Sequence, residues 1–220
     1  MQQNKPRVKS SASQRDQAYL SLQRLLILQK IPEGERLREP QWAAELGVNR
    51  TALREAFARL EAEGLIERGP ATGYFVPRLT LSDIAEIMQL RIVLESLAIR
   101  VICGAKGALQ KRLAPLKIAC DQFERFTIDG YSLATIEADR RFHESLIEAA
   151  QMRRLSLLYY RAPLPVIHRQ VTEENNWRQQ CMRTLDEHRA IIRYLQARNA
   201  SAAIRQIKVH LNRWPMIPMK

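Results

Sequence analysis

The stretch from Trp42 to Phe57, WAAELGVNRTALREAF, constrains the fold of this chain more than any other, because its pattern is typical of a helix-turn-helix. Two short helices that meet at a fixed angle need a small residue where they touch and a glycine where the chain reverses. Ala43 and Gly47 meet these needs. Apolar residues on both sides of the turn can pack the helices together: Trp42, Leu46, Val48 and Leu53. The pattern therefore predicts a helix-turn-helix, with an ordinary helical pair joined by a glycine turn as the alternative.

The exposed face of the second helix would carry polar side chains that suit DNA. These are Asn49, Arg50, Thr51 and Arg54. Such side chains reach base edges and phosphates when the helix lies in the major groove, and the pattern therefore predicts double-stranded DNA as a partner. Arg38 is a weaker candidate for a contact with the DNA backbone. Asn49 can either contact DNA or cap its helix, and the sequence leaves both roles open.

Two short apolar segments after the second helix predict a β-hairpin. They are residues 65–68 and 74–77, and the Gly- and Pro-rich residues 69–73 lie between them. Because Gly73 has no side chain, the tip of this hairpin can approach the DNA closely. A hairpin in this position makes the motif a winged helix-turn-helix.

The start of the chain is polar. Residues 1–15 are rich in Ser, Gln, Lys and Arg and predict a flexible N-terminal arm. Apolar residues recur at helical spacing over residues 16–28 and predict a first helix. The sequence therefore predicts a winged helix-turn-helix DNA-binding domain over residues 16–78.

The remainder of the chain, residues 79–220, shows no further strand signal. Its amphipathic patterns predict helices over residues 81–104, 109–128, 133–150, 155–160, 181–197 and 200–214. We therefore expect a mainly α protein, in which the winged helix-turn-helix precedes an all-α helical bundle.

The composition of the chain indicates which partners and which cellular compartment to expect. A net charge of +12 over 220 residues favours an anionic partner, with nucleic acid first. The three cysteines are widely spaced and include no CxxC pair, which indicates reduced thiols. No apolar run approaches the roughly 18 residues of a membrane span, and the first residues lack the apolar core of a signal peptide. We expect a cytoplasmic protein with no membrane partner.

Three of the four histidines fall on the inward faces of predicted helices. Asp139 and His143 are one helical turn apart and project from one side of the same helix. His188 and His210 each share a helix face with apolar residues. Three imidazoles and one carboxylate that converge in a bundle core suit a divalent metal such as Zn, Ni or Mn. The alternative is a set of hydrogen-bonded core histidines without a metal.

Arg91 lies on the apolar face of the predicted helix over residues 81–104, where a charge is costly unless it is paired. A carboxylate ligand bound beside the metal would supply a partner. An ion pair with Glu95 or Glu144 would also supply one, and the sequence leaves this choice open.

Several segments together resemble the GntR family of bacterial transcription regulators. The N-terminal segments are residues 32–37 (PEGERL), 46–56 (LGVNRTALREA) and 60–66 (LEAEGLI). The C-terminal segments, residues 91–95 (RIVLE), 139–143 (DRRFH), 187–191 (EHRAI) and 210–211 (HL), resemble the metal-binding helical effector domain (FCD) of the FadR-type branch. The chain departs from the family pattern in Pro40, in Trp42, and in having Gln151-Met152 where Gly-Asn is frequent.

The resemblance implies a homodimer that binds a palindromic operator and changes its operator affinity when a small carboxylate effector enters the helical domain. Residues 79–220 would then bind the effector and form the dimer. Arg50 and Arg54 would read bases and phosphates, and Thr51 would bind phosphate. In the mechanism that this resemblance implies, Asp139, His143, His188 and His210 hold the metal, Arg91 holds oxygens of the effector, and the helical dimer repacks. We expect a repressor without enzymatic activity.

Two other functions fit the sequence. A constitutive DNA-binding regulator would use the metal only structurally and would pair Arg91 with an acidic side chain. A metal-dependent enzyme would use the metal to activate water. The enzyme is the weaker alternative, because the sequence offers no general acid or base beyond the ligands and the winged helix would have no role.

Overall fold

The computed structural model divides the chain into two compact units, Met1–Arg78 and Leu79–Lys220. The structure describes residues 11–27, 30–69, 73–78, 80–161 and 176–213. None of the helices in these ranges is long and apolar enough to cross a membrane.

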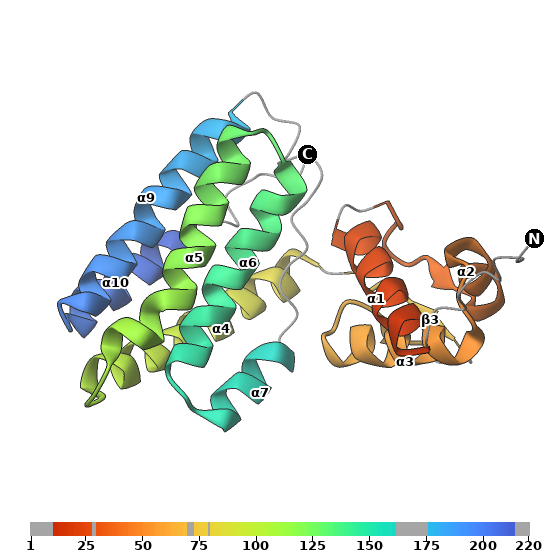
Figure 1. Ribbon diagram of the computed structural model, residues 1–220, viewed down its shortest axis with the longest axis horizontal. Helices are drawn as coiled ribbons and strands as arrows, with labels where there is room; N and C mark the ends of the chain where they lie inside the picture. Colours follow the sequence, from red (N-terminus) through yellow and green to blue (C-terminus); the bar gives the residue numbers. More distant parts are fainter. Residues whose placement is uncertain (1–10, 28–29, 70–72, 79, 162–175, 214–220) are drawn as a thin grey trace, which may run out of the picture. The chain divides into compact units, whose positions relative to one another are not determined.

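The N-terminal unit contains α1 (Ser11–Ile27), β1 (Arg36–Leu37), α2 (Glu39–Leu46), α3 (Arg50–Ala62), β2 (Glu67–Arg68) and β3 (Tyr74–Phe75) (Figure 1). The predicted helix-turn-helix is formed by α2 and α3. Gly47 between them has a φ of 63°, a left-handed conformation that glycine adopts without steric cost. Trp42, Ala43, Val48 and Leu53 are buried at this turn, and α1 packs against α3 to complete the core.

Helix α1 begins at Ser11, so the prediction of a flexible arm over residues 1–15 is wrong for residues 11–15. Polar contacts rather than apolar packing stabilise this first helical turn, so the spacing of apolar residues does not reveal it. The Gln14 side-chain oxygen accepts hydrogen bonds from the backbone and side-chain nitrogens of Asn49, at 3.2 and 2.7 Å. Arg15 forms an ion pair with Glu55 of α3 at 3.9 Å. Residues 1–10 of the predicted arm lie outside the described residues.

The three short strands form an antiparallel sheet in the order β1-β3-β2. The predicted hairpin is formed by β2 and β3, with Glu67 opposite Phe75 and Arg68 opposite Tyr74. Residues 70–72 of the intervening turn lie outside the described residues. The sequence did not predict β1, because two residues are too few to show an alternating pattern. The N-terminal unit is thus a winged helix-turn-helix.

The C-terminal unit contains α4 (Leu81–Gly104), α5 (Leu109–Ile128), α6 (Ser132–Ala149), α7 (Arg153–Arg161), α9 (Trp177–Gln196) and α10 (Ala200–Asn212). The prediction of a helical domain is confirmed in the described part of this unit. Both α7 and α9 begin earlier than predicted, at Arg153 and Trp177. Trp214, at the predicted end of the last helix, lies outside the described residues.

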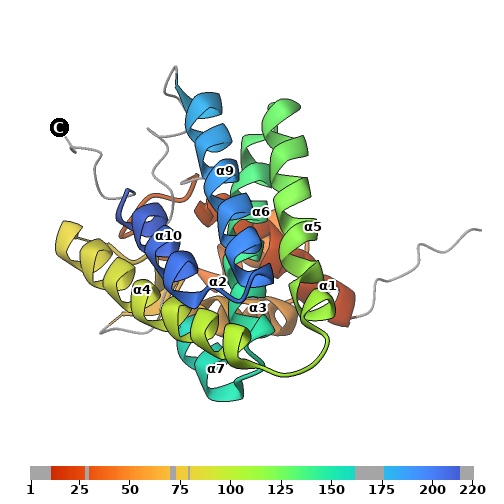
Figure 2. The same ribbon diagram turned by 90° about the vertical axis from the view of Figure 1, so that its left-hand side faces the viewer.

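The five long helices of this unit close a bundle. Each packs on the next in the order α4, α6, α5, α9 and α10, and α10 packs back on α4 (Figure 1 and Figure 2). The shorter α7 packs on α4 and α6. Fully buried apolar side chains fill the interior, among them Ile99, Leu116, Phe142 and Leu185. Polar groups at the centre of such a bundle are costly unless they are paired, so buried polar groups there indicate a candidate functional site.

Replacement of Asn49 by alanine should destabilise the N-terminal unit. The Asn49 side-chain oxygen accepts a hydrogen bond of 2.8 Å from the backbone nitrogen of Ala52 and so caps α3. We expect Asn49→Ala to lower the free energy of unfolding by about 1 kcal/mol. Asn49→Asp retains an oxygen acceptor at the cap and should lose clearly less. Urea unfolding of the full chain, monitored by circular dichroism, measures both; equal losses in the two variants would contradict the capping role.

Candidate metal centre and DNA-contacting surface

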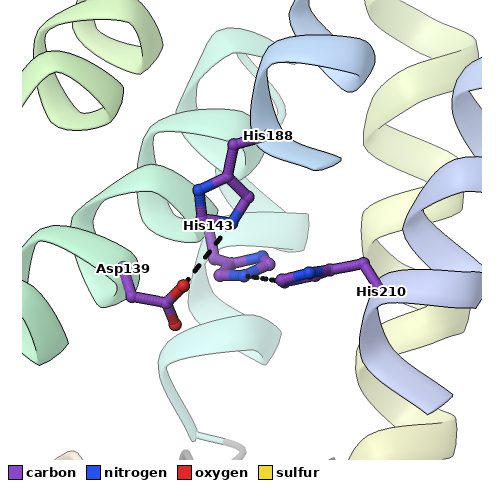
Figure 3. Close-up of side chains that lie close together, drawn as sticks. All are labelled: Asp139, His143, His188 and His210. Carbon is purple, nitrogen blue, oxygen red and sulfur yellow. Dashed lines mark hydrogen bonds and ion pairs between the residues drawn. The ribbon is translucent and has the colours of Figure 1, made fainter. Parts of the chain in front are cut away.

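Four side chains with metal-ligating atoms converge inside the bundle (Figure 3). Asp139 and His143 belong to α6, His188 to α9 and His210 to α10. One ligand atom from each lies within 4.8 Å of those from the other three. All three histidines are buried, and Asp139 is partly exposed. The structure therefore brings together all four residues that the sequence predicts as ligands.

The ring nitrogens of these histidines are close to one another or to the carboxylate. His143 Nε2 lies 3.0 Å from His210 Nε2, and His188 Nε2 lies 3.4 Å from Oδ1 of Asp139 (Figure 3). The ring of Phe142 stacks on that of His188, with 3.7 Å between the ring centres, and so orients this imidazole. Donor atoms from three helices thus face a common volume.

Two buried carboxylates bind the far side of two of these imidazoles. Glu95 Oε2 lies 2.7 Å from Nδ1 of His143, and Glu187 Oε2 lies 2.8 Å from Nδ1 of His210. A carboxylate at Nδ1 favours the tautomer that keeps the proton there and leaves a lone pair on Nε2. Two Nε2 lone pairs 3.0 Å apart repel each other unless a cation lies between them and the other donors. This arrangement therefore fits a bound metal ion.

Each of the two carboxylates is bound in turn by an arginine. Arg91 Nε donates to Glu95 at 3.1 Å, and the Tyr159 hydroxyl donates to the same carboxylate at 3.2 Å. Arg213 Nη2 donates to Glu187 at 2.8 Å. Two hydrogen-bonded series of arginine, glutamate and histidine thus flank the site. One runs from α4 to α6, and the other runs from the C-terminal end of α10 through α9 to His210. Such partners fix the orientation of ligating histidines.

Burial and neighbouring charges set the ionisation of this cluster. Burial lowers the pKa of His188 well below its usual value, and the neighbouring His210 and His143 lower it further. Burial alone would raise the pKa of Glu95, but its contacts with His143 and Arg91 outweigh this effect and lower the pKa to about 2. At pH 7, His188 is therefore a neutral ligand and Glu95 an ionised acceptor.

The formal charges around the site can be balanced by one divalent metal ion together with one anion. Three carboxylates, those of Asp139, Glu95 and Glu187, face two guanidinium groups, those of Arg91 and Arg213, which gives a net charge of −1. A divalent cation would change this to +1. An anionic ligand next to the cation would then neutralise the buried charge.

Several polar atoms of the cluster are buried without a hydrogen-bond partner among the described residues. They are Oδ1 of Asp139, both ring nitrogens of His188 and Nη2 of Arg91. Buried polar atoms are normally paired. A cation bound by Asp139 and His188 Nε2 would satisfy two of these atoms, and the donor set of three imidazoles and one carboxylate suits Zn, Ni or Mn. The residues present thus fit the predicted metal.

The structure identifies the acidic neighbour of Arg91. Its ion-pair partner is Glu95, one of the two that the sequence left open, whereas Glu144 pairs with Arg140. The terminal nitrogen Nη2 of Arg91 lies 3.1 Å from Oε1 of Glu95 in this ion pair but makes no hydrogen bond within the described residues. The ion pair and a contact with a bound carboxylate are therefore compatible, and the second remains a prediction.

Sequence reasoning missed three residues of this site. Glu187 directly precedes a predicted ligand, and Arg213 lies three residues after another, on the same face of its helix as His210. That spacing was a usable signal for Arg213. Tyr159 offered no comparable signal, because it reaches the site from α7.

The start of α3 presents the predicted DNA-contacting side chains. Arg50, Thr51 and Arg54 are exposed on it, and Arg38 is exposed just before α2. Arg54 Nε donates to Glu39 at 2.7 Å, an ion pair that joins α3 to α2. The roles of these side chains at DNA remain predictions, and Arg54 would have to share its guanidinium between Glu39 and DNA.

Asn49 adopts the capping role that the sequence left open. Its oxygen accepts from Ala52, and its amide nitrogen donates to Gln14. Both ends of the side chain thus have a partner within the protein, while one amide N–H and one lone pair remain for a further contact. A contact with DNA remains a prediction.

Gly73 lies at the described edge of the wing with a φ of 133°, a conformation that residues with side chains rarely adopt. A Cβ atom at this position would lie 3.2 Å from Nε of Arg36. The backbone of the wing therefore needs glycine here, whether or not Gly73 contacts DNA.

Comparison with known proteins agrees with both units. The model of the "Bacterial regulatory proteins, gntR family" matches residues 14–76, and the model of the "FCD domain" matches residues 86–213.

Relatives cover much of the chain. YdhC, an HTH-type transcriptional regulator of Bacillus subtilis, is 29% identical over 198 residues, which cover 89% of this chain and 87% of YdhC. A protein of Paenarthrobacter nicotinovorans, named "Probable D-xylose utilization operon transcriptional repressor", is 30% identical over 122 residues, or 56% of this chain and 53% of that protein. The solved structure of E. coli McbR/YncC shares the fold, with a TM-score of 0.72 at 20% identity over 94% of this chain and 95% of that chain.

The winged helix-turn-helix, the helical bundle and these matches lead to one conclusion. The chain belongs to the gntR family of bacterial regulatory proteins with an FCD domain, and it is a DNA-binding transcriptional regulator rather than an enzyme.

Proposed function

We propose that the protein is a homodimeric, metabolite-responsive regulator whose operator affinity is set by a small carboxylate bound at a divalent metal in the C-terminal unit. One observation carries this proposal: a buried cluster of three imidazoles and one carboxylate, in which Oδ1 of Asp139 and Nε2 of His188 lack hydrogen-bond partners among the described residues. A divalent metal satisfies these atoms and leaves a net positive charge that an organic acid can neutralise. The effector is therefore anionic.

The metal would be held by Asp139, His143, His188 and His210. When bound, it supplies a positive centre for a carboxylate oxygen. Arg91 binds further oxygens of the acid through Nη2, which lies 3.1 Å from Oε1 of Glu95 but makes no hydrogen bond within the described residues. The acid thus contacts α4 through Arg91 and the ligand helices through the metal.

A homodimer matches the DNA-binding unit to a palindromic operator. Each copy presents one α3 helix, and two-fold symmetry in the protein corresponds to two inverted half-sites in DNA. A change in the packing of the helical units would alter the spacing of the two α3 helices and therefore the operator affinity. The repressor named among the relatives supports repression as the regulatory outcome.

A constitutive regulator with a purely structural metal is the second candidate. The ion pair of Arg91 with Glu95 favours it, because it gives this buried arginine a partner without any effector. The two candidates differ in whether an organic acid changes operator affinity.

Titration with organic acids should change binding to DNA from the region upstream of the protein's own gene. With Zn, Ni or Mn present, we expect one acid from a panel of sugar, hydroxy, dicarboxylic and aromatic acids to shift the operator Kd about tenfold or more. The shift should vanish after chelation and in Arg91→Lys, a variant that keeps a positive charge beside Glu95. Fluorescence anisotropy of labelled DNA measures both. Tight operator binding that is indifferent to every acid and to metal would favour the constitutive regulator.

Removal of the carboxylates behind the histidines should weaken metal binding. We expect Glu95→Gln and Glu187→Gln each to raise the metal Kd about 10- to 100-fold, because the glutamates orient the ligating imidazoles and raise their basicity. Competition with a chromophoric chelator measures the Kd. Glu148→Gln is the control, since Glu148 is exposed on α6 and accepts only from Tyr160 among the described residues. Equal affinity in all four proteins would contradict this role.

Arg50→Ala should lower operator affinity about 10- to 100-fold and leave binding to unrelated DNA much less affected, because a bidentate contact with guanine discriminates between bases. Arg24→Ala removes an exposed arginine of α1 and serves as the charge-matched control. Anisotropy titrations at one fixed salt concentration separate specific from non-specific binding. A parallel loss on both DNAs would show that Arg50 contributes charge rather than base recognition.

A further inference from the structure

One side of α4 exposes apolar side chains, although the other side lies in the bundle core. Leu90, Val93 and Leu97 are exposed, and Val93 is the most exposed of them at 64%. The nearest exposed charges on this helix are Glu86 before this set and Arg100 after it. Within the described residues, neither of these two charges has an ion-pair partner.

These five side chains form one stripe, which we call the α4 stripe. A helix turns by about 100° per residue, so Glu86, Val93 and Arg100, spaced by seven, lie within roughly 40° of one another. Leu90 and Leu97 lie about 40–60° to one side of Val93 by the same geometry. The stripe is about 21 Å long, from the helical rise of 1.5 Å per residue.

We propose that the α4 stripe is the two-fold contact between two copies of this chain, with the two α4 helices antiparallel and crossing at Val93. This inference rests on the homodimer of the proposed function and adds the surface that forms it. In a two-fold pair, the residues on either side of the axis exchange places. Leu90 then lies opposite Leu97 of the second copy, and Glu86 lies opposite Arg100 of the second copy.

The charges make this stripe complementary to itself. Glu86 and Arg100 are each seven residues from Val93 and carry opposite charges, so an antiparallel pair forms two ion pairs around an apolar centre. A parallel pairing would instead place each of these charges opposite the same residue of the second copy, and like charges would repel. The stripe therefore selects one orientation as well as one partner.

Another exposed apolar residue of the bundle lacks this property. Ile118 on α5 is 57% exposed, close to the value for Val93. The residues seven positions on either side of it are Lys111 and Arg125, both cations. An antiparallel self-pairing of α5 centred on Ile118 would place these cations opposite each other. Exposure of an apolar side chain alone therefore does not make a contact between copies.

The helices next to α4 offer further apolar surface. α4 packs on both α10 and α7 and runs between them in Figure 2. α7 exposes Leu157 and Leu158, and α10 exposes Val209. Stable interfaces bury about 1,200 Å² or more in total, which exceeds the contact of a single helix pair. The α4 stripe would form the centre of the interface, and these neighbours allow it to reach that size.

The helix that carries the stripe also carries two residues that support the proposed metal centre, because Glu95 contacts His143 and Arg91 contacts Glu95. Arg91 and Glu95 lie on α4 between the exposed residues of the stripe and are buried on its inner side. A ligand that moves Arg91 would therefore move the residues that contact the second copy. This arrangement gives the dimer a direct physical connection to the effector.

Sedimentation velocity of the metal-loaded full chain, over about 0.1–100 μM, tests the surface. Val93→Asp places two carboxylates against each other at the axis and should weaken dimerisation about 100-fold. Ile118→Asp makes the same change at a matched exposure on α5 and should leave the dimer intact. Circular dichroism confirms that both variants are folded. If both variants dissociate equally, or neither does, the inference is overturned.

Charge reversal tests the orientation and does not depend on an apolar-to-charged change. Glu86→Arg and Arg100→Glu should each weaken the dimer about tenfold, because each places like charges opposite one another. The double variant should regain the original affinity, and an equimolar mixture of the two single variants should form a heterodimer.

The outcomes also separate this inference from the proposed function. A dimer that is unaffected by Val93→Asp and by both charge reversals overturns the α4 stripe and leaves the homodimer standing. A chain that is monomeric at every concentration overturns both.

Discussion

The burial of three imidazoles inside an otherwise apolar bundle is the constraint on which the C-terminal unit depends. Polar rings are costly there unless their nitrogens are paired. Glu95 pairs with His143 and Glu187 pairs with His210, and each glutamate is itself held by an arginine. These contacts join α4 to α6 and α9 to α10. A helix that slipped by one turn would leave charged groups buried without partners, so the polar centre also fixes how the helices are aligned.

The N-terminal unit shows that a positive net charge is not the same as a set of available cations. Arg54 is paired with Glu39 and Arg68 with Glu61. The guanidinium of Arg59 lies 3.6 Å from the centre of the Tyr19 ring. These arginines stabilise the helix-turn-helix and its wing. Arg50 has no ion pair within the described residues, so it is the arginine of α3 that can contact DNA without giving up an ion pair.

Sequence patterns predicted the parts of the structure that depend on periodicity. The glycine turn at Gly47 and the apolar residues around it predicted the helix-turn-helix, and the inward positions of three histidines predicted that these side chains converge with Asp139. The start of α1 could not be predicted, because its contacts to Asn49 are polar and come from a distant segment. The same reason applies to Tyr159, which reaches Glu95 from another helix.

The connection between the two units is short. Val76 is buried in the N-terminal core, and its backbone bonds to Gly34 and Glu35. Thr80 already caps α4 through reciprocal hydrogen bonds with Asp83. Three residues lie between these two anchored positions, and the four Cα–Cα steps from Val76 to Thr80 span at most about 14 Å when extended. In a dimer, a tether of this length limits how far each DNA-binding unit can move away from its helical unit. The length of the tether therefore restricts the distances between operator half-sites that two DNA-binding units can bind at the same time.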